Sequence, residues 1–181
     1  MRFYMKIIII LSIVRIISPI SILFYPLWGT IFCVLVDAAD HSVLVLTGAR
    51  KTFSLTKYEK YDKFLDLWQY MFMFLTSIGT PLFNIISFFF FIRVFGNIFF
   101  LITNNREIFL YTPNVFEALY IIYFIVLRYL QIDITQNTLM FMFIILVILI
   151  LKFIQEYMVH HKGFFPFSFL YKKLGKDFFD K

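Results

Sequence analysis

Long apolar runs separated by short polar segments make up most of the chain. The runs cover about residues 6–26, 27–47, 58–80, 82–102, 115–132 and 139–158. A transmembrane helix needs about 20 mostly apolar residues, so each run is of the length that crosses a bilayer. We therefore predict an all-α, polytopic membrane protein with six transmembrane helices in a single domain over residues 1–181.

Composition agrees with this prediction. Hydrophobic residues make up 61% of the chain and charged residues 15%, whereas about 25% of the residues in an average soluble domain are charged. The one cysteine, Cys33, excludes an internal disulfide and a cysteine-based zinc site. Residues 159–181 alternate aromatic and basic side chains, so we expect this tail to lie in the membrane interface.

The distribution of Lys and Arg predicts the orientation in the membrane. These residues gather near the N-terminus, between the second and third runs, after the fourth run and in the tail, whereas the segments 25–29, 77–81 and 131–137 contain none. By the positive-inside rule, both termini and the segment that joins the second and third runs are cytoplasmic. The net charge of +6 in such a protein more often attracts anionic lipid than nucleic acid. We expect membrane lipid as a partner and no nucleic acid.

Four aspartates near the cytoplasmic ends of the second and third runs are the candidate chemistry. Asp37 and Asp40 are three residues apart, and Asp62 and Asp66 are four apart, so each pair shares one helix face. Unpaired carboxylates at this depth are costly, and a bound divalent cation offsets the cost. Carboxylate oxygens are the ligands that hard cations prefer. The spacing predicts a metal site with Asp37, Asp40, Asp62 and Asp66 as ligands.

The same residues resemble a known family, the CDP-alcohol phosphatidyltransferases. Members are six-span membrane enzymes whose motif places two acidic pairs at the end of the second span and the start of the third. Asp37 with Asp40 and Asp62 with Asp66 match these pairs. In the first run, Ser12, Arg15 and Pro19 resemble the family's usual Thr, Arg and Pro.

The resemblance implies a fold, a reaction and a set of site residues. The expected fold is the family's bundle. The expected reaction moves a phosphatidyl or other substituted phosphoryl group from a CDP-linked donor to an alcohol acceptor, in phospholipid synthesis, with Mg²⁺ or Mn²⁺. Asp66 would also act as the catalytic base, and Ser12, Arg50 and Arg93 would bind substrate. Members are commonly homodimers, so a homodimer is the implied assembly.

The chain also departs from the family motif. His41 stands in place of the first motif glycine, Leu44 and Val45 replace its Ala-Arg, and Tyr58 replaces the second glycine. Two other functions therefore stay open. One is a catalytically inactive relative with the same fold, and the other is a small cation or metabolite carrier that uses the same aspartates.

Overall fold

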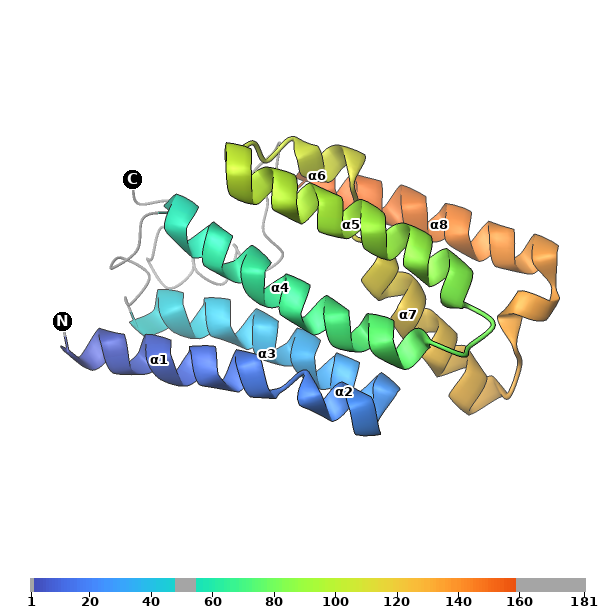
Figure 1. Ribbon diagram of the computed structural model, residues 1–181, viewed down its shortest axis with the longest axis horizontal. Helices are drawn as coiled ribbons and strands as arrows, with labels where there is room; N and C mark the ends of the chain where they lie inside the picture. The colour runs from blue at the N-terminus through green and yellow to red at the C-terminus, as the bar shows by residue number, and fades with distance from the viewer. Residues whose placement is uncertain (1, 48–54, 159–181) are drawn as a thin grey trace.

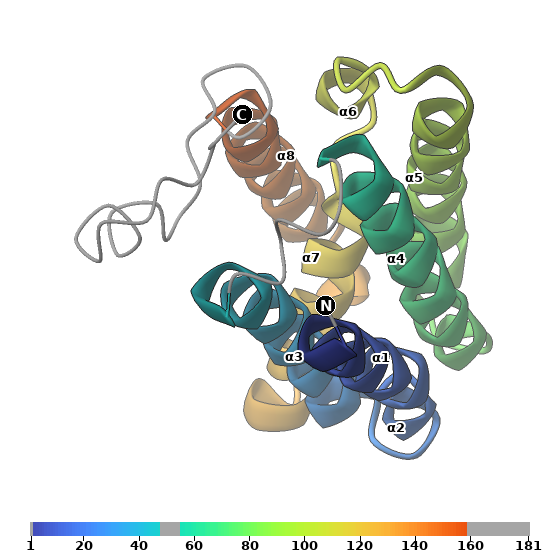
Figure 2. The same cartoon turned by 90° about the vertical axis from the view of Figure 1, so that its left-hand side faces the viewer.

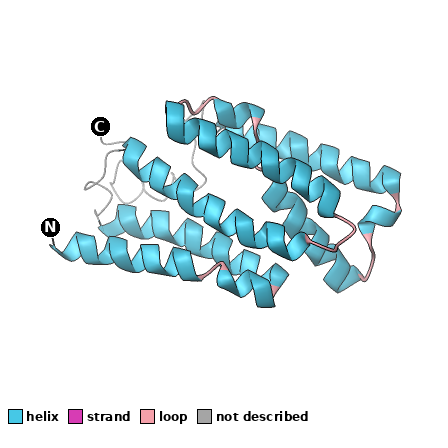
Figure 3. Ribbon diagram, viewed as in Figure 1, coloured by secondary structure: helices cyan, strands magenta, loops and turns pink. Residues whose placement is uncertain are grey.

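The protein is all-helical in the parts that its computed structural model describes, which are residues 2–47 and 55–158 (Figure 3). The α-helices are α1 (Arg2–Ile17), α2 (Ile20–Phe24), α3 (Pro26–Thr47), α4 (Leu55–Ser77), α5 (Phe83–Thr103), α6 (Ile108–Tyr111), α7 (Val115–Ile125) and α8 (Thr138–Glu156). A π-helical turn, η2 (Val126–Leu130), continues α7, and a 3-10 turn, η3 (Ile134–Gln136), precedes α8. The predicted interfacial tail lies outside the described residues.

Four of the described segments are long and apolar enough to cross a membrane. They are Met5–Phe24, Pro26–Leu44, Phe83–Thr103 and Thr138–Glu156. They coincide with the first, second, fourth and sixth predicted spans. The third predicted span is the helix α4, whose first half is rich in charged residues, and the fifth is α7, which is α-helical for only 11 residues. The membrane character of the chain is thus supported, and the count of six spans stays a prediction.

Helix α7 runs through the middle of the bundle and carries much of its core (Figure 2). Val115, Phe116, Leu119 and Tyr120 are each 0% exposed. Helices α3, α4, α5 and α8 all contact α7, which explains why its sequence is apolar on every side.

The long helices alternate in direction. The starts of α1 and α4 and the ends of α3 and α5 therefore lie at one end of the bundle, on the left in Figure 1, and α8 also runs toward that side.

Two residues with special backbone roles shape the region around α1, α2 and α3. Pro19 has no backbone N–H and lies between α1 and α2, so the first predicted span is bent there. Gly29 lets α3 pack closely on α2, because an added Cβ would lie 2.6 Å from the backbone nitrogen of Ile22. On the N-terminal side of the bend, Leu44 of α3 and Tyr58 of α4 pack against Ile8 and Leu11 of α1. These contacts hold α1, α3 and α4 side by side.

Candidate functional site

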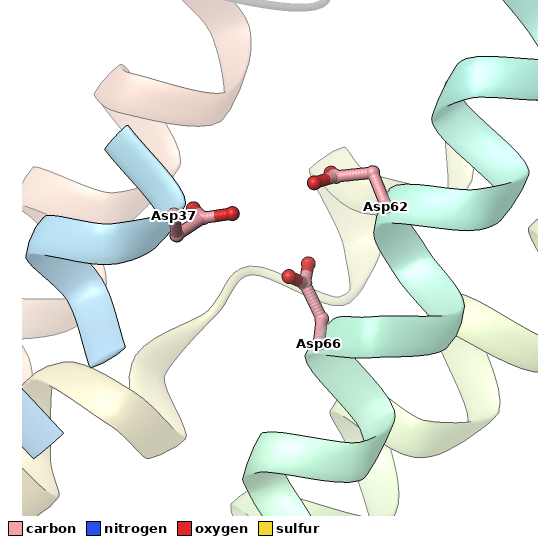
Figure 4. A group of neighbouring side chains, drawn as sticks. All are labelled: Asp37, Asp62 and Asp66. Carbon is pink, nitrogen blue, oxygen red and sulfur yellow. The ribbon is translucent and has the colours of Figure 1, made fainter. Parts of the chain in front are cut away.

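The structure brings the two aspartate pairs together from neighbouring helices. Asp37 and Asp40 lie on α3, and Asp62 and Asp66 lie on α4. Figure 4 shows the carboxylate of Asp37 facing those of Asp62 and Asp66 across the space between the two helices. One carboxylate oxygen from each of these three residues lies within 4.8 Å of the others, a grouping that could hold a metal ion.

Arg15 of α1 lies at the centre of the four aspartates. Its guanidinium nitrogens contact one oxygen of each: Asp37 at 2.5 Å, Asp40 at 2.9 Å, Asp62 at 2.7 Å and Asp66 at 3.0 Å. The planar guanidinium carries five N–H donors, which is why one arginine can serve several carboxylates at once. Arg15 therefore joins α1, α3 and α4 through one side chain.

Lys63 and Tyr58 complete the cluster. The Lys63 ammonium contacts Asp62 Oδ2 at 3.0 Å and Asp66 Oδ2 at 2.7 Å, and the Tyr58 hydroxyl donates to Asp40 Oδ1 at 3.3 Å. Two basic side chains face four carboxylates. With all of these groups ionised, the cluster retains two negative charges.

Exposure differs sharply among the four carboxylates. The side chain of Asp37 is 44% exposed and that of Asp40 only 2% exposed, while Asp62 and Asp66 lie between these values. A ligand would therefore approach the cluster from the Asp37 side. Asp40 is placed to anchor Arg15 from within.

Two of the three predicted substrate-binding residues can be located. Ser12 lies on α1 one turn before Arg15, where its hydroxyl donates to the Ile8 carbonyl at 2.7 Å and accepts from the Tyr61 hydroxyl at 2.6 Å. Ser12 thus borders the aspartate cluster but is already hydrogen-bonded within the bundle. Arg50 lies outside the described residues.

Arg93, the third of these residues, belongs to a separate polar cluster. Its guanidinium donates to the Thr112 carbonyl at 2.8 Å, pairs with Glu156 at 3.3 Å and lies 4.8 Å from the centre of the Phe109 ring. The side chains of Arg93 and Glu156 are 5% and 10% exposed. These contacts of Arg93 join α5 to α6, to the segment before α7 and to α8 rather than to the aspartates.

A further hydrogen-bonded network lies on the turn of α4 that follows Asp66, at Gln69 and Tyr70. Asn114 donates to the Tyr70 hydroxyl at 2.8 Å and to Glu117 Oε2 at 2.7 Å, while Gln69 donates to Glu117 Oε1 at 3.1 Å. These polar groups are satisfied by one another, as buried polar groups generally are. The network links α4 to the start of α7.

The partners of Arg15 could not be predicted from the sequence. An arginine inside the first apolar run and four aspartates in the next two runs were visible in it, and Arg15 had no acidic residue near it in the first run. Placing them together needs the relative rotation of α1, α3 and α4, which depends on packing between helices. Lys63 is different, because it is adjacent to Asp62 and three residues before Asp66, a spacing from which its pairing with Asp66 could have been predicted.

Comparisons with known proteins do not identify this arrangement. No protein-family model matches the chain, and neither the curated proteins nor the solved structures contain a match.

Proposed function

We propose that the protein is a metal-dependent membrane transferase that moves a phosphatidyl or other substituted phosphoryl group from a CDP-linked donor to an alcohol. The observation that supports this most is the convergence of Asp37, Asp62 and Asp66 from two helices. All their donor atoms are carboxylate oxygens, which fit Mg²⁺ or Mn²⁺. With Arg15 and Lys63 paired, the cluster retains a charge of minus two, which would attract a divalent cation.

The reaction can be described in terms of this chain's own residues. The acceptor hydroxyl attacks the donor phosphorus that carries the transferred group, and the bond from that phosphorus to the CMP oxygen breaks. Asp37, Asp40 and Asp62 would hold the metal, and Asp66 would accept the hydroxyl proton. A bound divalent ion would neutralise negative charge on the attacking and leaving oxygens. Arg15 and Lys63 form ion pairs with these carboxylates in this structure. Both side chains would therefore have to move when the ion binds.

The proposal includes a topology. Helix α4 and the α7–η2 segment complete six spans in it, with both termini and the aspartates at the cytoplasmic side. The absence of Lys and Arg from segments 25–29, 77–81 and 131–137 supports this orientation. Ser12, Arg50 and Arg93 remain the proposed substrate-binding residues, and the implied assembly is a homodimer.

A second candidate function is a non-catalytic relative of the same fold. The observation that favours it is the ion pairing of Arg15 and Lys63 with the aspartates. Basic side chains can balance buried carboxylates without any metal, and the cluster would then serve to hold α1, α3 and α4 together.

Release of CMP separates the two candidate functions. Purified protein in detergent is incubated with CDP-diacylglycerol, a panel of alcohols and Mg²⁺, and free CMP is measured. The transferase proposal expects release by the parent and none by Asp62→Asn or Asp66→Asn. Asp133→Asn is a matched control, because Asp133 accepts hydrogen bonds from Thr135 before α8, away from the cluster. Full activity in Asp66→Asn would overturn the assignment.

A further inference from the structure

A hollow of about 300 Å³ lies at the end of the bundle where α2 ends and α3 begins, whereas the aspartates lie near the middle of α3 and α4. The end of α2, the start of α3 and the last turns of α7 and η2 form its walls, with Phe24, Trp28, Phe124, Leu127 and Arg128 among the lining residues. Trp28 and Asp37 are nine residues apart on α3, which corresponds to about 14 Å along the helix. The hollow is therefore separate from the candidate metal site.

Arg128 is the charged residue of this hollow. It is exposed on the π-helical turn η2, and among the described residues it has no hydrogen bond or ion pair. The segments 25–29, 77–81 and 131–137, which lie at the same end, contain no other Lys or Arg. The hollow thus offers a single unneutralised positive charge.

Aromatic side chains provide the apolar part of the hollow. Phe24, Tyr25, Trp28 and Phe124 all line it. Trp and Tyr are enriched where membrane proteins meet the lipid headgroups, because their rings have both an apolar and a polar part. An apolar wall beside one cation at headgroup depth suits a ligand with an anionic head and a hydrocarbon chain.

We propose that this hollow binds an anionic phospholipid of the leaflet on this side of the membrane. The lipid phosphate pairs with Arg128 in the fork geometry that guanidinium groups form with phosphate. The adjoining part of one acyl chain lies against Phe24, Trp28 and Phe124. A small soluble anion would leave these aromatic walls without a partner, so charge and shape together favour a lipid. The site is independent of the proposed transferase reaction.

Tryptophan fluorescence gives a direct test. The chain has two tryptophans, Trp28 and Trp68, so a Trp68→Phe parent reports from the hollow alone. This parent is reconstituted in phosphatidylcholine vesicles with increasing fractions of brominated phosphatidylglycerol, whose bromines quench nearby indoles. Brominated phosphatidylcholine provides the comparison lipid. We expect half-maximal quenching at a mole fraction about fivefold lower for the anionic lipid, which corresponds to about 1 kcal/mol per basic residue near an anionic surface.

Variants of Arg128 show whether its positive charge causes the preference for the anionic lipid. In Arg128→Gln the two quenching curves should coincide, and in Arg128→Lys most of the preference should return. Arg106→Gln also removes one positive charge, but at the other end of the bundle, where Arg106 pairs with Glu59, so it should retain the preference. Coinciding curves in the parent, or an unchanged preference in Arg128→Gln, would overturn the proposal. Loss of the preference on adding inorganic phosphate would assign the site to a free anion and would also overturn it.

Discussion

Two arginines are buried in the bundle, and they are neutralised in different ways. The side chains of Arg15 and Arg93 are 4% and 5% exposed. Arg15 contacts four carboxylates, whereas Arg93 contacts one carboxylate, one backbone carbonyl and the face of an aromatic ring. One positive charge is thus surrounded by an excess of negative charge, and the other is balanced.

This difference separates a candidate cation site around Arg15 from a charge-balanced pair at Arg93. An arginine inside an apolar helix is costly, and one well-placed carboxylate can offset that cost. Arg93 has such a partner in Glu156. Arg15 has three carboxylates more than it needs, and Lys63 neutralises only one further charge. This excess of negative charge explains why a divalent cation would be attracted to the aspartates around Arg15 and not to the Arg93–Glu156 pair.

The largest expected effect is the loss of Arg15. Arg15→Met keeps the apolar stem but leaves four carboxylates facing Lys63 alone. Removing one partner of a buried ion pair typically costs about 3–5 kcal/mol, so we expect a destabilisation of that size in metal-free buffer. The free energy of unfolding in detergent, followed by circular dichroism with and without Mg²⁺, measures it.

Magnesium makes the result for Arg15→Met informative. If the aspartates bind a divalent ion, Mg²⁺ should restore much of the lost stability, because the ion replaces the missing positive charge. Arg106→Met is the control, since its surface pair with Glu59 should contribute at most about 1 kcal/mol. Destabilisation that Mg²⁺ leaves unchanged would support the non-catalytic candidate function.

The two arginines also show which features of the fold and of the site could be predicted from the sequence. The apolar runs predicted the positions of the long helices, and the three- and four-residue spacings placed each aspartate pair on one face. The contacts of Arg15 and Arg93 could not be read in this way, because they join helices far apart in the sequence. Arg93 was predicted to bind substrate phosphate, and the structure places it beside Glu156, a residue that follows it by 63 positions.

A smaller effect is expected at Arg93. Arg93→Met removes the guanidinium from Glu156 and from the Thr112 carbonyl, for an expected loss of about 3 kcal/mol. The double variant with Glu156→Gln should lose less than the sum of the two single variants, because the charge left behind is also removed. Unfolding of all three variants measures this coupling. Additive losses, or a rescue of Arg93→Met by Mg²⁺, would contradict the distinction between the two arginines.

The smallest of these effects concerns Glu117, which has amide partners instead of an arginine. Glu117 accepts from Gln69 and Asn114 through its two oxygens. Glu117→Gln has the same shape, but its amide nitrogen must face one of those two donors. One hydrogen bond is then lost and a buried donor is left unpaired, at a cost of about 1–3 kcal/mol. The free energy of unfolding measures the change, and Glu107→Gln, at an exposed position just before α6, is the control for the same exchange. A Glu117→Gln variant more stable than the parent would contradict this expectation, because removal of the buried charge would then outweigh the lost hydrogen bond.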